Sequence, residues 1–334
     1  MFSSASHWPL GRSARAIASA EDAFAISETA DDESLSVGAN FSLCCAHITT
    51  GHWRKAESSF ETIAASLTGE RQYERCGLPF VPAVISRSWL VWALAERGEF
   101  EQGQRDADEA LQIAKDVGHP FNLAHIYYDM GYFYAVKGEF ELVVDALSRG
   151  YDLIQEWNLS YLPPFITGFY GHACVLDGQV KYGTGLLKRA ISEYASIGLG
   201  LFRSLVTMQV SEALLLRGWD REAWDTAEQA LILAIRRGEC GHEACVRRLL
   251  DDMALRDNTG DAATVKEHFR KALEAAVAFD LQPIEAHCHF GLSRVHGIEG
   301  DRPTSKVYLQ RATSMYRQMG MSSWVERAQT SIGR

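Results

Sequence analysis

The chain has few prolines and little positive charge. Its 334 residues include 8 prolines against 27 glycines, and its formal net charge is −10. A protein that holds a nucleic-acid backbone needs clustered lysine and arginine side chains, so this balance argues against nucleic acid as a partner. The content of 47% hydrophobic and 10% aromatic residues argues against disorder. We therefore expect a folded helical protein with turns punctuated by glycine.

Long apolar runs and a secretory signal are also missing. Residues 1–10 contain no basic segment followed by an apolar core, which a signal peptide requires. No apolar run approaches the roughly 20 residues that a membrane-spanning helix needs. Seven cysteines, an odd number without the spacing of a disulfide framework, suit buried thiols in a reducing compartment. These absences predict a cytoplasmic protein with no membrane partner.

Internal repetition is the strongest positive feature of the chain. A glycine ends a helix-like apolar segment at successive intervals of 40, 47, 40, 40, 40, 42 and 40 residues. Segments with helically spaced apolar residues follow these glycines. Regular periods of about 20–50 residues indicate a solenoid or another repeat architecture. The glycines are Gly11, Gly51, Gly98, Gly138, Gly178, Gly218, Gly260 and Gly300.

Residues 127–140 indicate which repeat this is. Tyr127, Met130, Gly131 and Tyr134 match the first helix of a tetratricopeptide repeat, and Gly138 ends that helix. The period of 40 exceeds the roughly 34 residues of the standard repeat, so the helices or connections are longer. The sequence predicts an all-α fold, a right-handed tetratricopeptide-like α-solenoid of about seven helix pairs.

The predicted repeats divide the chain into three parts. Residues 1–33 form a partial leading repeat with a lone second helix, residues 34–320 form seven repeats, and residues 321–334 form a C-terminal capping helix. Repeats bury their apolar faces against their neighbours, so a chain that starts within a unit leaves one face uncovered. We therefore expect the chain to be a fragment or a shortened relative of a larger protein.

Three stretches carry a family resemblance: residues 237–250, residues 281–292, and residues 315–321 with Trp324. They resemble the carboxy-terminal tetratricopeptide region of bacterial adenylate/guanylate cyclase-like proteins, in which a class III cyclase domain and an AAA-type ATPase module precede the repeats. The resemblance implies a non-catalytic regulatory module in signal transduction, with the upstream cyclase or ATPase modules as attached partners. No strand-rich segment that could form a cyclase core occurs in the sequence, so we predict that the chain is not an enzyme.

Two sets of residues resemble a nucleotide-binding loop and a metal site, and both are better explained by helix packing. Gly178 to Gly185 comes closest to a nucleotide-binding P-loop, but Thr184 stands where the lysine is required. Histidines and cysteines of two neighbouring repeats are ligands that zinc accepts, although their spacing is not that of a zinc site. We predict no catalytic residue, no cofactor and no metal. The second set is Cys240, His242, Cys245, His287, Cys288 and His289.

The first helices of this fold line its concave face, which makes their aromatic residues the candidate binding groove. Aromatic and Met side chains with a few polar groups suit a peptide or a helix of a protein partner. Two alternatives stay open: the same residues pack against one another, or the face holds a small-molecule effector, by analogy with the repeat domains of large ATP-dependent bacterial transcription activators. The candidate residues are Phe41, Trp92, His125, Tyr128, Tyr132, Phe165, His172, Met208 and Glu212.

Overall fold

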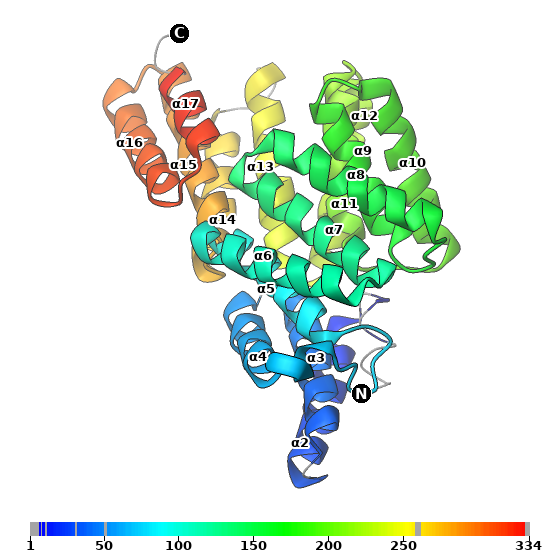
Figure 1. The fold of residues 1–334 in the computed structure, drawn as a ribbon. Helices are drawn as coiled ribbons and strands as arrows, with labels where there is room; N and C mark the ends of the chain where they lie inside the picture. Colours follow the sequence, from blue (N-terminus) through cyan, green and yellow to red (C-terminus); the bar gives the residue numbers. More distant parts are fainter. Residues whose placement is uncertain are drawn as a thin grey trace.

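The computed structural model describes residues 7, 9–10, 12–30, 32–49, 52–257 and 262–330. Sixteen α-helices and a short 3₁₀ helix lie within these residues, and the same residues contain no strand (Figure 1). The elements are α2 Ser13–Ala30, α3 Glu33–Thr49, α4 Trp53–Ser66, η1 Gly69–Tyr73, α5 Pro82–Arg97, α6 Phe100–Val117, α7 Pro120–Lys137, α8 Phe140–Glu156, α9 Pro163–Leu176, α10 Val180–Ser196, α11 Arg203–Leu216, α12 Asp220–Arg237, α13 Cys240–Asp257, α14 Ala262–Ala278, α15 Gln282–Ile298, α16 Arg302–Gln318 and α17 Ser322–Thr330.

Consecutive helices pack as hairpins, and the hairpins stack side by side (Figure 1). From α3 to α16 each odd-numbered helix packs against the next even-numbered one, which gives the seven helix pairs of the predicted α-solenoid. The all-α repeat fold is thereby confirmed. The boundaries of the leading repeat, the seven repeats and the cap stay a prediction.

The turns inside the helix pairs use the glycines that the period marks. Gly98, Gly138, Gly178, Gly218 and Gly300 all have positive φ, from 74° to 92°, a left-handed conformation that glycine adopts without steric cost. Each therefore ends the first helix of its pair. The other three glycines of the series, Gly11, Gly51 and Gly260, lie outside the described residues.

A second series of left-handed residues, which the 40-residue glycine period does not reveal, ends the second helices. Four of its members are glycines, but Asn158 and Asp280 interrupt the glycine pattern with φ of 47° and 58°. Asn and Asp are the side chains that tolerate this conformation best. The glycine members are Gly118, Gly198, Gly238 and Gly320.

Close approach of paired helices depends on small residues. A Cβ on Gly131 of α7 would lie 2.4 Å from the Leu147 side chain of α8, so only glycine fits there. Gly183 of α10 lies against the backbone of Gly171 of α9, where a Cβ would be 2.3 Å from the carbonyl oxygen. The near match to a P-loop around Gly183 is therefore a helix-packing feature.

The C-terminal helices return to contact the N-terminal half. Asp280, after α14, lies 3.1 Å from the Arg97 guanidinium at the end of α5. The Ser323 hydroxyl of α17 donates a 2.9 Å hydrogen bond to the carbonyl of Gly138, and a Cβ on Gly138 would lie 2.9 Å from the ring of Trp324. These contacts curl the solenoid so that its inner helices surround a common interior.

Candidate functional site

The nine predicted groove residues divide into two groups by exposure. Seven are buried: Phe41, Trp92, His125, Tyr128, Tyr132, Phe165 and Met208. The side chains of the other two, His172 and Glu212, are 17% and 22% exposed and lie 2.7 Å apart from Nε2 to Oε2. The concave face therefore presents a few polar groups instead of an open aromatic surface.

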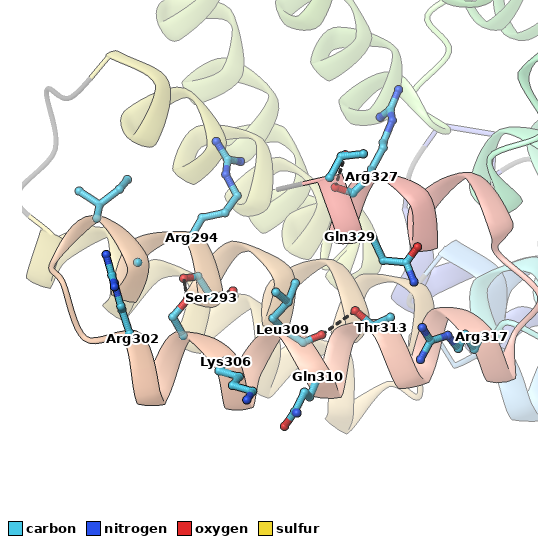
Figure 2. Close-up of a pocket in the computed structure, with 14 residues that line it drawn as sticks. Ser293, Arg294, Arg302, Lys306, Leu309, Gln310, Thr313, Arg317, Arg327 and Gln329 are labelled. Carbon is cyan, nitrogen blue, oxygen red and sulfur yellow. Dashed lines mark hydrogen bonds between the residues drawn. The ribbon is translucent and has the colours of Figure 1, made fainter. Parts of the chain in front are cut away.

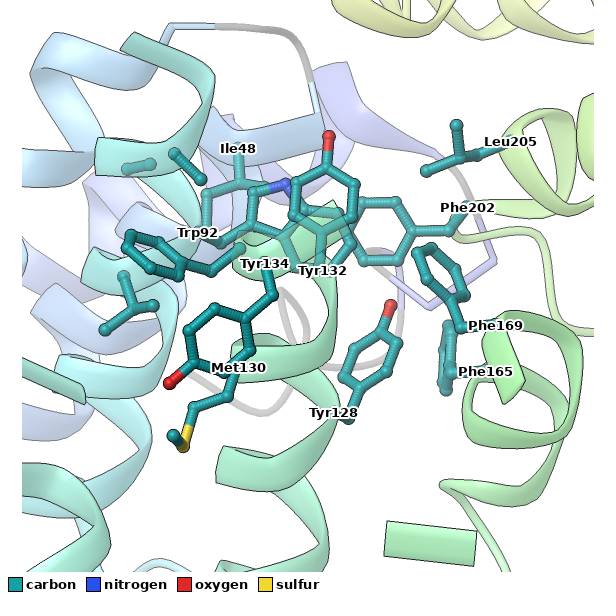
Figure 3. Packing of buried hydrophobic residues seen from close by; sticks show 14 of the residues in the cluster. Ile48, Trp92, Tyr128, Met130, Tyr132, Tyr134, Phe165, Phe169, Phe202 and Leu205 are labelled. Carbon is teal, nitrogen blue, oxygen red and sulfur yellow. The ribbon is translucent and has the colours of Figure 1, made fainter. Parts of the chain in front are cut away.

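The buried aromatic side chains form a stacked core between α5, α7 and α9 (Figure 3). The indole of Trp92 stacks on Tyr132 at 3.6 Å and on Phe202 at 4.8 Å between ring centroids. Tyr128 meets Phe169 edge to face at 5.1 Å. These residues pack against one another, which is the alternative that the sequence left open. Such pairs stabilise the fold beyond the burial of their area.

Phe202 completes this core from outside the regular helices. It precedes α11 and has φ of 54°, so the left-handed turn aims its ring at Trp92. The repeat pattern gave no signal for this residue because it lies in the connection between two repeats.

Two buried Ser–His–carboxylate clusters lie beside the core, and neither has the geometry of a catalytic triad. His125 Nδ1 lies 3.2 Å from the Ser88 hydroxyl and 2.9 Å from Asp129 Oδ2. A triad uses opposite nitrogens of the imidazole for the hydroxyl and the carboxylate, whereas here one nitrogen faces both. Burial raises the pKa of Asp129. The second cluster has the same arrangement and consists of Ser204, Glu239 and His242.

Next to the aromatic core the interior opens into a cavity of ≈580 Å³. The inner helices α7, α9, α11, α13 and α15 form most of its wall, α8 and Glu96 of α5 contribute to it, and α17 closes one side. Four of the predicted groove residues line the cavity, namely Tyr132, His172, Met208 and Glu212, whereas the other five belong to the surrounding core. Its volume lies within the range of about 300–1,000 Å³ that is typical of ligand sites.

Charged pairs from three helices face this cavity. Arg248 and Arg294 lie 2.8 Å and 2.9 Å from the two oxygens of Asp252. Burial alone would raise the pKa of Glu212, but the hydrogen bond from His172 and the charge of Arg248 outweigh it and lower this pKa. Glu212 is thus held as a carboxylate within the cavity.

Two other titratable side chains, His287 and Glu96, line the same cavity, and burial favours the uncharged form of each. Burial, and next the charge of Arg248, lower the pKa of His287 well below its ordinary value, so the imidazole is neutral at neutral pH. Its Nδ1 lies 2.7 Å from the Tyr316 hydroxyl. Burial raises the pKa of Glu96, against the hydrogen bond that the Tyr132 hydroxyl donates to it.

Three buried polar atoms in the cavity wall have neither a hydrogen-bond nor an ion-pair partner within the described residues. They are Nε of Arg248 and Nε1 of Trp324, both donors, and Oε1 of Gln209, an acceptor. Buried polar groups are nearly always paired, and each unpaired one carries a cost of about 1–3 kcal/mol. The wall therefore offers two donors and one acceptor to a molecule that enters.

Helix α17 places an aromatic and a cationic side chain at the edge of the cavity. The rings of Trp324 and His287 are 4.2 Å apart between centroids. The guanidinium of Arg327 lies 5.5 Å from the ring centroid of Phe140 and 4.8 Å from that of Trp324. Helix α17 therefore covers one side of the cavity and carries groups that can contact a bound molecule.

The candidate zinc ligands are not brought together. Cys240, at the start of α13, has its thiol 3.6 Å from the carbonyl of Gly238, whereas Cys288 is buried on α15. Within the part of the chain that the structure describes, no three His, Cys, Asp or Glu side chains are grouped closely enough to hold a metal ion. Across the same part of the chain, no helix combines the length and the apolar character needed to cross a bilayer.

Comparison with known proteins places the fold. No family model and no curated protein matches the chain. The Rap protein complexed with competence and sporulation factor has a TM-score of 0.64 at 12% identity, over 88% of this chain and 80% of that chain. The Rap conjugation gene regulator of plasmid pLS20, in complex with the Phr* peptide, has a TM-score of 0.64 at 14% identity, over 88% and 77%.

NprR in complex with its cognate peptide NprX is similar as well, with a TM-score of 0.59 at 11% identity over 87% of this chain and 82% of that chain. At these identities the likeness establishes the fold and nothing beyond it. The chain is a tetratricopeptide-like helical repeat protein.

Proposed function

We propose that the chain is a non-catalytic regulatory module that binds a short peptide in its concave cavity. The observation that carries this proposal is the set of unpaired donors and acceptor in the cavity wall, Arg248 Nε, Trp324 Nε1 and Gln209 Oε1. Peptide units present N–H donors and carbonyl acceptors, so a peptide backbone offers partners for both kinds of atom. Pairing these atoms removes unsatisfied buried groups, which favours the bound state.

The remaining cavity groups suit the side chains of such a peptide. Phe140 and Trp324 supply apolar contact area at the edge, and aromatic rings lose little conformational entropy on binding. Arg294 and Glu212 offer a charge of each sign within the same cavity. We infer that the preferred peptide combines an apolar anchor with a charged residue.

The solved relatives in fold support this proposal by analogy. Three of them are complexes with competence and sporulation factor, the Phr* peptide and the cognate peptide NprX. The regulatory role and the attached cyclase or ATPase modules rest on the resemblance of residues 237–324 alone, and they remain part of the proposal. A ligand-dependent change in the curvature of the repeats would transmit binding to such modules.

A cavity-blocking variant tests the proposal. Ala135 is half-buried at the cavity wall, so the indole of Ala135→Trp occupies space in the cavity, while Ala195→Trp places the same side chain on the exposed surface of α10 as a control. Peptides selected from a displayed random library on the wild-type protein should bind Ala135→Trp at least about tenfold more weakly and Ala195→Trp unchanged. Equal binding to all three proteins would show that the peptides bind elsewhere.

A small-molecule effector is the second candidate, favoured by the cavity volume of ≈580 Å³. Thermal unfolding in the presence of a metabolite library separates the two candidates. A ligand at one hundred times its dissociation constant stabilises the fold by about 2.7 kcal/mol. The second candidate would be favoured if a metabolite stabilises the wild type but not Ala135→Trp, and if the library yields no binding peptide. The ligand of the cavity would then be a small-molecule effector.

A further inference from the structure

A second hollow, of ≈1600 Å³, adjoins the concave cavity at Arg294 and Arg327 and differs from it in chemistry (Figure 2). Residues of α15, α16 and α17 line it. We call it the basic groove, because five of its lining residues are cationic and no Asp or Glu side chain is among the described residues that line it. The cations are Arg294, Arg302, Lys306, Arg317 and Arg327.

Three of these cations have no anionic partner within the described chain. Arg294 is held by Asp252, and Arg327 lies against aromatic rings. Arg302, Lys306 and Arg317 are exposed on α16 and make no ion pair with any described residue. Their spacing of 4 and 11 residues places all three on one face of the helix. Figure 2 shows them in a row along α16.

The groove lies where α17 stops covering α16. Helix α17 has 9 residues, whereas α15, the equivalent helix of the preceding pair, has 17. Gln329 and Thr330 at the end of α17 line the groove, and Arg302 and Lys306 lie beyond them on α16. Elsewhere in the solenoid, a first helix packs on the second helix before it. The groove is therefore the part of the α16 surface that the shorter helix α17 leaves uncovered.

We propose that the basic groove docks an acidic amphipathic helix of a partner protein. The three unpaired cations supply the complement to its carboxylates. Leu309 and Ile298, which is 63% exposed, supply apolar contacts for its other face. A nucleic acid fits less well, because the net charge of −10 repels an extended polyphosphate outside the groove.

Charge reversal tests the docking proposal on the full chain. The probe is a labelled amphipathic peptide of about 18 residues that forms a helix with leucine on one face and glutamate on the other. The groove variant is Arg302→Glu/Lys306→Glu/Arg317→Glu. The control variant, Lys181→Glu/Lys188→Glu/Arg221→Glu, makes the same change in net charge at exposed sites outside the groove. Circular dichroism checks that both variants are folded.

The groove variant should bind the glutamate peptide at least about tenfold more weakly than wild type. It should instead bind a peptide in which lysine replaces every glutamate. The control variant and the cavity-blocked Ala135→Trp should bind the glutamate peptide like the wild type, which separates this site from the concave cavity. Equal weakening in both triple variants, an absence of saturable binding to wild type, or tighter binding of an oligouridylate of about 12 nucleotides would overturn the proposal.

Discussion

The interior of the solenoid has two regions that are built from the same kind of helix and differ in what fills them. Where α5, α7 and α9 face one another, the rings of Trp92 and Phe165 pack against Phe169 and Phe202 and form a core. Where α7 and α9 face α11, α13 and α15, the inward residues are smaller or charged, as at Met208 and Arg248, and a cavity remains. Side-chain volume on the inner helices thus decides whether the concave face becomes core or site.

This difference teaches where the stability and the binding capacity of the fold lie. The aromatic region gains stability from burial of apolar area and from ring contacts. The cavity region keeps charged pairs such as Arg248–Asp252 and His172–Glu212 in partly buried positions. Such groups add little to stability but orient a ligand. Substitutions in the two regions should therefore have different signatures.

The largest effect is expected from Trp92→Ala in the aromatic core. The Trp92 side chain is 0% exposed and contacts rings from three neighbouring segments. Truncation leaves a cavity between the inner helices and should lower the free energy of unfolding by about 3–5 kcal/mol. Trp219→Ala, at an exposed position where only Arg217 stacks on the ring, should cost less than about 1 kcal/mol. Urea unfolding measures both, and similar losses would mean that the ring core is not a main source of stability.

Two glycine substitutions test whether α17 closes one side of the cavity. Both place alanine at a left-handed φ, so both carry the same backbone strain. Gly138 and Gly300 have φ of 92° and 82°, so alanine is strained at both, by about 1 kcal/mol. A Cβ at Gly300 meets open space, whereas one at Gly138 meets Trp324 at 2.9 Å. Gly138→Ala should therefore cost about 1–2 kcal/mol more in unfolding free energy than Gly300→Ala. Equal costs would mean that Trp324 of α17 does not pack against Gly138, and therefore that α17 does not close this side of the cavity.

The pH dependence of stability should reveal a buried carboxyl between α13 and α14, where Asp251 lies 3.1 Å from His268 Nδ1. Asp251 of α13 is 1% exposed, and burial, together with the neighbouring Asp252, raises its pKa to about 8. The folded state therefore favours the protonated form. Relative to Asp251→Asn, the wild type should be equally stable near pH 4 and should lose about 1–3 kcal/mol as the pH rises toward 8.

Thermal unfolding of both proteins across this pH range measures the difference. Asp145→Asn, at an exposed carboxylate of α8, is the matched control and should show no such divergence. A parallel pH profile for wild type and Asp251→Asn would contradict the assignment of a buried acid.

The sequence predicted the repeat and its turns, because these depend on local conformation. Gly98, Gly138 and Gly178 adopt the left-handed φ that their positions after apolar helices indicated. The turns at Asn158 and Asp280 were missed since a search for glycines does not find them. The contact of Ser323 with Gly138 joins residues 185 positions apart, and no local pattern predicts it.

The sequence predicted part of the cavity lining, for a related reason. The helical register placed Tyr132, His172, Met208 and Glu212 on the inner face, and all four line the cavity. The same register also placed Trp92 on the inner face, but the Trp92 side chain is buried in the core. The curvature of the superhelix decides between these outcomes, and it results from packing summed over every repeat. Gln209 and Arg248 were not predicted because their importance comes from a missing partner, which only the structure reveals.

The most direct test of the division into core and site is amide hydrogen exchange with and without a selected peptide. Exchange protection reports local opening, and a bound ligand lowers the opening of the helices that it contacts. The division predicts new protection in α11, α13, α15 and α17 and little change in α5, whose Trp92 side chain packs in the aromatic core. Protection confined to α5 and the outer helices, with none in α13 or α15, would contradict the placement of the binding site in the cavity.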